Sequence, residues 1–186
     1  MKDNEFIRVE KVPMTKEEVR AISLDKLGLH QAKNMLDVGS GTGSVSLQAA
    51  ITYPNLKITA IERSEDAVGA MQQNIEHFNL SNIELIKGYA PIELNETFDA
   101  IFVGGTGGNL EDIVNWCDEH LLPGGRMVFN FILLENALEA APLLENLGWG
   151  ELDMITVQAG RWTKLGKGHY FKPQNPTIII TCEKPL

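Results

Sequence analysis

The sequence is short of residues that build metal sites. Only two cysteines, Cys117 and Cys182, occur among 186 residues, and they form no C-x-x-C pair. The four histidines are scattered and show no metal-ligand spacing. We therefore expect no metal, and we expect a reducing compartment.

Long apolar runs are also missing. The run from Met127 to Leu134 is interrupted by Asn130 and is far too short to span a bilayer. The first five residues are polar, unlike a signal peptide. These features predict a cytoplasmic protein with no membrane partner.

Positive charge is scarce as well, because 16 Lys and Arg stand against 25 Asp and Glu, for a net charge of −9. A general nucleic-acid binder needs a basic surface, so we expect no nucleic-acid partner. A small anion needs only a local basic cluster. The length predicts a single domain spanning residues 1–186, with residues 1–30 as an N-terminal segment and helix.

The stretch from Asn34 to Val45 combines a short apolar strand, a glycine-rich turn and the start of a helix. Gly39, Gly41 and Gly43 are spaced as G-x-G-x-G, which matches neither the G-x-G-x-x-G dinucleotide pattern nor a phosphate-binding loop. Glycines let the backbone approach a ligand, and a helix N-terminus offers free N–H groups. A tight strand-to-helix turn without a ligand is the alternative.

A second strand, predicted at 57–62, ends in Glu62. In a βαβ unit, an acid at this place can bind the hydroxyls of a ribose. The alternative is a solvated strand end.

The rest of the chain alternates helices with strands. The capping box Thr15-x-x-Glu18 predicts a helix that ends at Gly28. Further helices are predicted at 44–53, 65–78, 110–121 and 135–147, and strands at 83–87, 98–103, 127–133, 151–159 and 176–183. This alternation predicts an α/β fold with a mostly parallel sheet covered on both faces.

Ligands of such sheets bind outside the carboxyl ends of the strands. Those ends place the glycine turn, Glu62 and Arg63, residues 88–91, residues 104–109 and Asn130 at one edge. Four of the six residues at 104–109 are glycines, which predicts close approach of a large ligand, with a flexible loop as the alternative.

The loop predicted at 160–175 carries four cations and no acid, interleaved with aromatic residues. Cations bind carboxylates, Arg best of all, and aromatic rings cover apolar surfaces. We therefore predict a lid that binds a flat polyanion, with a solvated charged face as the alternative.

Residues Asp37 to Gly43, together with Glu62, resemble motif I of class I S-adenosylmethionine-dependent methyltransferases. Four segments together resemble the CbiT family of cobalamin biosynthesis: PMTKEEVR at 13–20, LDVGSGTG at 36–43, GGTGGNL at 104–110 and GHYFKP at 168–173. The resemblance covers nearly the whole chain. It implies a three-layer Rossmann-like fold, with a seven-stranded mostly parallel sheet and one antiparallel strand near the C-terminus.

The resemblance further implies methylation of C15 of precorrin-7 or precorrin-6Y, with or without cobalt, and decarboxylation of the ring C (C12) acetate. S-adenosyl-L-methionine would be the methyl donor. The electron-rich macrocycle could react without a protein nucleophile. The family also implies a homotetramer and a CbiE-type C5-methyltransferase partner.

The resemblance assigns site residues in three groups. The cofactor-binding group is Thr15, Asp37, Gly39, Ser40, Gly41, Thr42, Gly43, Glu62, Arg63, Tyr89, Ala90 and Gly104. The substrate-binding group is Gly105, Thr106, Gly107, Asn109, Asn130, Arg161, Lys164, Lys167 and Lys172. His169 and Tyr170 are candidates for proton handling, with a structural role in the lid as the alternative. Tyr89 stands where many family members carry an acid, and it can stack on the adenine or point away.

Two alternatives stay open. One is another class I methyltransferase, acting on a tRNA base or a protein carboxyl group. The other is a non-catalytic scaffold subunit of the corrin pathway.

Overall fold

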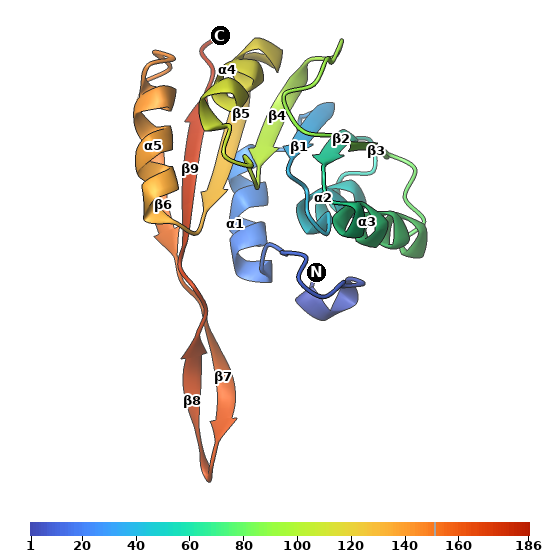
Figure 1. Cartoon of the computed structure of the whole chain (residues 1–186), viewed down its shortest axis with the longest axis vertical. Helices are drawn as coiled ribbons and strands as arrows, with labels where there is room; N and C mark the ends of the chain where they lie inside the picture. Colours follow the sequence, from blue (N-terminus) through green and yellow to red (C-terminus); the bar gives the residue numbers. More distant parts are fainter. Residues whose placement is uncertain (151) are drawn as a thin grey trace.

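The molecule is a seven-stranded sheet with helices on both faces and a long hairpin that projects from one edge (Figure 1). The computed structural model describes residues 1–150 and 152–186. The strand order is β3-β2-β1-β4-β5-β9-β6. The strands are β1 (Asn34–Val38), β2 (Lys57–Glu62), β3 (Ile83–Lys87), β4 (Phe98–Val103), β5 (Leu121–Phe131), β6 (Asp153–Val157) and β9 (Thr177–Glu183).

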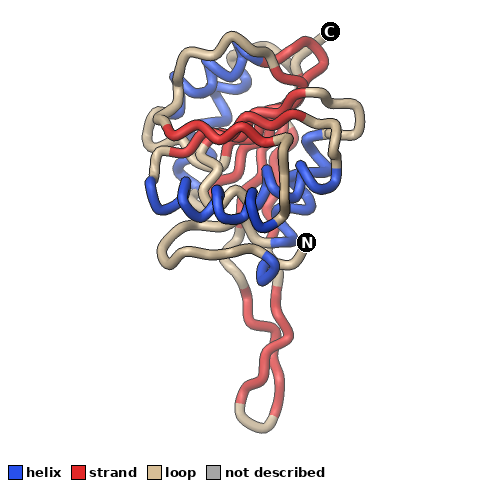
Figure 2. The backbone as a smooth tube through the Cα atoms, turned by 90° about the vertical axis from the view of Figure 1, so that its right-hand side faces the viewer, coloured by secondary structure: helices blue, strands red, loops and turns tan. Residues whose placement is uncertain are grey.

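The helices form two layers around the sheet, which Figure 2 shows edge-on. The elements are η1 (Asp3–Glu5), α1 (Glu17–Leu27), α2 (Ser44–Thr52), α3 (Glu65–His77), α4 (Leu110–His120) and α5 (Leu134–Glu145). One apolar core joins α1 and α2 to the sheet, and a second core joins α4 and α5 to its other face. Helix α3 contacts α2 and β3. The predicted three-layer architecture is confirmed.

The sheet has its topological switch point at β1. Strands β2 and β4 pair in parallel with β1, one on each side, and β9 runs antiparallel between β5 and β6. The one antiparallel strand near the C-terminus is therefore confirmed. The chain crosses from one side of β1 to the other, which leaves a crevice outside the carboxyl ends of β1 and β4.

Local signals explain most element ends. The Ser64 hydroxyl accepts a hydrogen bond from the Ala67 N–H and caps α3. Gly28, at a φ of 63°, ends α1 in the left-handed conformation. The predicted capping box at Thr15 is wrong, because Lys16 is the N-cap and no side chain caps α1. The Thr15 carbonyl instead accepts a hydrogen bond from Arg20 Nη1 at 2.6 Å.

Strand β5 begins earlier than predicted. Residues 122–126, which precede the predicted strand, lie inside β5, where the pairing with β4 shifts from Phe98↔Leu121 to Ala100↔Arg126. The irregular stretch is kept in the sheet by Lys184, whose N–H donates to the Gly125 carbonyl at 2.9 Å. The predicted start of the next strand at Glu151 lies outside the described residues, and β6 is described from Asp153.

The segment predicted as a loop at 160–175 is a β-hairpin, which corrects that prediction. Strands β7 (Gly160–Leu165) and β8 (Gly168–Pro173) pair in antiparallel fashion and form a separate two-stranded sheet. We call this hairpin the arm. Figures 1 and 2 show that it extends away from the body of the molecule and does not fold over it.

No helix in the described part of the chain combines the length and apolar character that a membrane crossing requires.

Candidate active site

A pocket of about 370 Å³ lies at the carboxyl ends of β1, β2 and β4. Most of the predicted cofactor residues line it: Thr15, Gly39, Ser40, Gly41, Glu62, Arg63, Tyr89, Ala90 and Gly104. Three predicted substrate residues, Gly105, Thr106 and Gly107, line it as well. Its size lies within the range of small-molecule sites. The carboxyl edge of the sheet is thus the site that the strand order predicts.

The two glycine turns touch each other at the floor of the pocket. A Cβ on Gly39 would lie 2.7 Å from the Gly105 carbonyl oxygen, and one on Gly104 would lie 3.2 Å from the Gly39 carbonyl oxygen. Gly39 also has a φ of 70°, which side chains rarely adopt. The Gly104 N–H donates to the Val38 carbonyl at 2.9 Å and joins this loop to β1. Position 39 therefore requires a glycine, and backbone forms the floor of the pocket here.

Glu62 turns its carboxylate into the pocket from the end of β2. One oxygen accepts a hydrogen bond from the Gly41 N–H and the other from the Ser64 N–H, each at 2.8 Å. The side chain is only 9% exposed. An anion held by two N–H donors keeps lone pairs for further donors, such as the two hydroxyls of a ribose.

Asp37, Thr42 and Gly43 do not line the pocket. Asp37 is fully buried beneath the turn, where the Ser46 hydroxyl donates to its Oδ2 at 2.5 Å. Burial raises the pKa of Asp37 to about 7, against the opposing hydrogen bond from Ser46 and with help from the negative charge of Glu62. Its Oδ1 and the Thr42 hydroxyl are buried without a hydrogen-bond partner in the described structure. Asp37 therefore supports the turn from below.

Sequence analysis missed one wall of the pocket, which is formed by Glu10, Lys11, Val12 and Pro13. The Pro13 carbonyl lies where a Cβ on Gly41 would approach it to 3.0 Å. This stretch has neither helical nor strand periodicity, so no pattern pointed to it.

The N-terminal segment is attached to the body at two places. Asn74 of α3 accepts from the Ile7 N–H at 2.7 Å and donates to the Ile7 carbonyl at 2.9 Å. The guanidinium of Arg20 is fully buried and donates to Gln48 Oε1 at 2.7 Å and to the Met1 carbonyl at 2.8 Å. These attachments hold the missed wall against the pocket.

Two predicted substrate residues lie near this edge but outside the pocket. Asn109 is the N-cap residue of α4, and its side chain makes no capping hydrogen bond. Asn130, near the end of β5, donates from Nδ2 to the Ser23 hydroxyl of α1 at 3.0 Å. Asn130 therefore joins α1 to the sheet.

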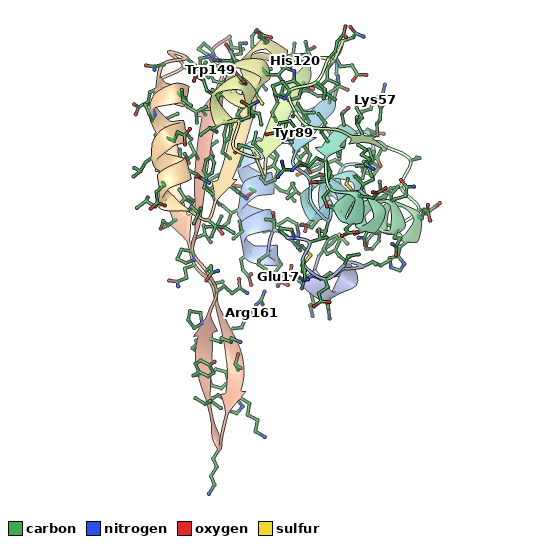
Figure 3. All side chains as sticks on the ribbon, in the orientation of Figure 1. Glu17, Lys57, Tyr89, His120, Trp149 and Arg161 are labelled. Carbon is green, nitrogen blue, oxygen red and sulfur yellow. The ribbon has the colours of Figure 1, made fainter. Side chains whose placement is uncertain are left out.

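The arm residues do not line the pocket either. Arg161 pairs with Glu17, at 3.3 Å, and with Glu18, and Figure 3 shows it at the base of the arm beside α1. Burial works against ionisation of Glu17, but the hydrogen bond and charge of Arg161 outweigh it and lower the pKa of Glu17. Arg161 thus fixes the base of the arm.

The remaining predicted residues of the arm are exposed: Lys164, Lys167, His169, Tyr170 and Lys172. The His169 ring stacks on Trp162, with ring centroids 4.8 Å apart, and Phe171 meets Trp162 edge-on at 5.3 Å. The arm therefore presents an aromatic face and a set of lysines to its surroundings.

The sheet order, the single antiparallel strand and the site at the switch point define a Rossmann-like methyltransferase fold. A family model described as the precorrin methyltransferase domain matches residues 9–184. The chain belongs to this precorrin methyltransferase family.

Three similar proteins share almost the full length of the chain. The cobalt-precorrin-6B C(15)-methyltransferase (decarboxylating) of Salmonella typhimurium is 47% identical over 184 residues, which are 99% of this chain and 96% of the relative. The crystal structure of precorrin-6y C5,15-methyltransferase from Geobacter metallireducens is similar with a TM-score of 0.91 at 35% identity, covering 99% and 96% of the two chains. The precorrin 8W decarboxylase of Methanobacterium thermoautotrophicum is similar with a TM-score of 0.89 at 31% identity, covering 98% of each chain.

Proposed function

We propose that this protein is an S-adenosylmethionine-dependent enzyme of cobalamin biosynthesis that methylates C15 of a precorrin and decarboxylates its ring C acetate. The observation that carries the proposal is the bare-backbone pocket with Glu62 at its rim, in a chain of the precorrin methyltransferase family. We place the reaction in the cytoplasm, as the sequence composition predicts.

The pocket fits the methyl donor in shape and chemistry. Gly105 lines the pocket with open space within 4 Å of its Cα substituent position, so a ligand can lie on the backbone there, and Glu62 offers acceptors for ribose hydroxyls. The donor would supply an electrophilic methyl group. The protein would contribute orientation and exclusion of water, because none of the residues that line the pocket is a cysteine, serine–histidine pair or other activated nucleophile.

The acceptor follows from the relatives and from the arm. The Salmonella relative is named for cobalt-precorrin-6B and the Geobacter structure for precorrin-6y, in agreement with the precorrin acceptor expected from the sequence, precorrin-7 or precorrin-6Y. We therefore take the 6B form, with or without cobalt, as the acceptor. The carboxylates of this acceptor would pair with Lys164, Lys167 and Lys172 if the arm of a neighbouring copy lay over the pocket.

His169 or Tyr170 could handle protons only under the same condition, with the arm of one copy over the pocket of another. Neither residue lines the pocket of its own chain, and His169 is stacked on Trp162. A part in holding the arm together is the role that these contacts support. Arg161, which pairs with Glu17, would set the direction of the arm before it meets the carboxylates of the acceptor.

We further propose a homo-oligomer, a tetramer by family resemblance, in which the arms are covered by neighbouring copies. Trp162, Leu165 and Phe171 are each 65% exposed on the arm, an unusual amount of apolar surface for a projecting hairpin. Light scattering should show more than one chain per particle, and the double variant W162A/F171A should lower that number. A CbiE-type C5-methyltransferase is a proposed partner, which co-purification of the two proteins would test.

The reaction is tested with the intact chain, S-adenosylmethionine labelled in its methyl group, and cobalt-precorrin-6B. The expected product has gained one labelled methyl group and lost one CO₂, as measured by mass spectrometry. Methyl transfer to tRNA or to a protein carboxyl group instead would contradict the proposal. An inactive chain that only binds a pathway enzyme would favour the scaffold alternative.

A further inference from the structure

One side chain crosses the rim of the pocket and joins two loops that the sheet leaves apart. Tyr89 lies in the loop between β3 and β4, and its hydroxyl donates to the Gly107 carbonyl, in the loop between β4 and α4, at 3.0 Å. Both residues line the pocket. Tyr89 is 45% exposed, so burial alone does not hold it there.

Arg63 supports the tyrosine from a third element, the end of β2. The Arg63 guanidinium carbon lies 5.3 Å from the centroid of the Tyr89 ring, within the distance of a cation–π contact. We call Arg63, Tyr89 and Gly107 the clasp. It joins the ends of β2, β3 and β4 at the mouth of the pocket.

The backbone at Gly107 is shaped to receive this ring. A Cβ there would lie 2.8 Å from Tyr89 Cε2, 3.0 Å from its hydroxyl oxygen and 3.2 Å from Arg63 Nη1. The neighbouring Gly108 has a φ of 89°, but a Cβ on it would meet nothing within 4 Å. Gly107 therefore accommodates the clasp, while Gly108 serves only the turn.

The loop that the clasp holds has few other restraints. Its first residues are joined to β1 through the Val38 carbonyl, and its last turn closes with the Asn109 N–H donating to Thr106 at 3.1 Å. Among the described residues, Tyr89 supplies the side-chain hydrogen bond to residues 104–108, and no other side chain does so. The position of the Gly107 peptide thus depends on Tyr89.

We infer that Tyr89 is a positioning residue that couples the cofactor side of the pocket to the acceptor side, by holding the loop at 104–108 through the Gly107 carbonyl. The inference rests on the proposed function, which places the methyl donor beside Tyr89 and the precorrin beside the loop. The Tyr89 hydroxyl thus acts on the protein's own backbone, at the Gly107 carbonyl.

The first test removes only the hydroxyl. Y89F should speed amide hydrogen exchange of residues 104–109 in the ligand-free protein by about threefold to tenfold, which is the value of one hydrogen bond. The KM for cobalt-precorrin-6B should rise by a similar factor, while the Kd for S-adenosylmethionine changes less than about twofold. Y53F, a change at the end of α2 outside the pocket, should match the wild type. Unchanged loop exchange in Y89F, or loss of cofactor affinity as large as in Y89A, would overturn the inference.

The second test uses the two glycines. G107A and G108A both place a side chain at positive φ, but only the first collides with the clasp. G107A should exceed G108A by about threefold or more in loop exchange and in acceptor KM, and the two should become equal in a Y89A background. Equal effects in the wild-type background would contradict the inference. Exchange is measured without ligand, so a failure to bind S-adenosylmethionine would refute the proposed function and leave the clasp to be judged separately.

Discussion

The pocket draws its lining from residues between Glu10 and Ile113, whereas the arm is one continuous stretch, Gly160–Pro173. Both lie at the carboxyl edge of the sheet (Figure 1). The floor of the pocket is backbone with the buried carboxylate of Glu62 beside it, while the arm consists of exposed lysines and rings. A substitution in the pocket should therefore affect the fold and the cofactor together.

The arm should behave in the opposite way. Its hydrogen bonds are local to the hairpin, and Arg161 joins its base to α1. A substitution near its tip removes little that the body needs, so its effect should appear only with the acceptor or in assembly. We therefore expect pocket residues to bind the methyl donor and arm residues to select the acceptor.

The largest effect is expected from G39A. The new Cβ would meet the Gly105 backbone, and the left-handed φ adds about 1–2 kcal/mol of strain. We expect cofactor affinity to fall by more than about 100-fold and the free energy of unfolding to fall by at least about 2 kcal/mol. G69A, in α3 where a Cβ meets nothing within 4 Å, should leave cofactor affinity unchanged. Calorimetry measures the cofactor affinity, and urea unfolding measures the free energy of unfolding. An unchanged Kd for S-adenosylmethionine in G39A would contradict the expected difference between pocket and arm.

The next largest effect is expected from E62Q. The amide keeps the shape but loses the charge that the Gly41 and Ser64 N–H groups now solvate. The Kd for S-adenosylmethionine should rise by about tenfold to 100-fold, because charge-assisted hydrogen bonds are the strong ones. E84Q, an exposed change on β3, is the control. If E62Q bound the cofactor as tightly as E84Q does, Glu62 would not be the ribose-binding acid.

The pH dependence of stability tests the buried side of the pocket. The folded pKa of Asp37, about 7, exceeds its ordinary value of 3.8. Its contribution to stability is therefore fully present below about pH 4 and is lost as the pH rises to about 7. D37N should lack this loss, so the free energy of unfolding of D37N should rise relative to that of the wild type by roughly 3–4 kcal/mol across that window. D112N, at an exposed position of α4, should follow the wild-type curve. If the unfolding free energies of D37N and the wild type changed in parallel with pH, the raised pKa of Asp37 would be contradicted.

The smallest effect is expected on the arm. K164A/K167A should raise the KM for the precorrin by about fivefold, because exposed ion pairs are weak, and the difference should shrink at high salt. The Kd for S-adenosylmethionine should change less than about twofold. K57A, at the opposite edge of the sheet, controls for lost charge (Figure 3). Equal loss of cofactor and acceptor binding in K164A/K167A would remove the distinction between pocket and arm.

Much of the fold could be predicted because its signals are local. Glycine turns, the Ser64 cap and the alternation of strands and helices located the sheet and its carboxyl edge. The edge in turn placed Glu62 and the turns at 39–41 and 104–107 in one pocket, although they are far apart in the sequence. The general rule for parallel sheets was sufficient for this step.

The parts that could not be predicted depend on long-range contacts. Arg20 resembles a surface residue of α1, yet it is fully buried because carbonyls of Met1 and Thr15 surround its guanidinium. The wall at 10–13 has no periodicity of its own and is positioned by such contacts.

The loop predicted at 160–175 was wrong for a different reason, because the sequence there does contain features of a β-hairpin. Trp162, Thr163, Tyr170 and Phe171 are residue types that are enriched in strands, and they flank a turn in which Gly166 has a φ of 57°. The lysines and glycines led us to predict a loop. Arg161 pairs with Glu17 and Glu18 of α1 at the base of the arm, a long-range contact that no local pattern predicts.

The central claim is that the pocket at β1, β2 and β4 binds S-adenosylmethionine without help from the arm. The most direct test is calorimetric titration of S-adenosylmethionine into the intact chain and into K164A/K167A. We predict one site per chain, with the same Kd, on the order of micromolar, for both proteins. The absence of saturable binding to the intact chain would contradict the account.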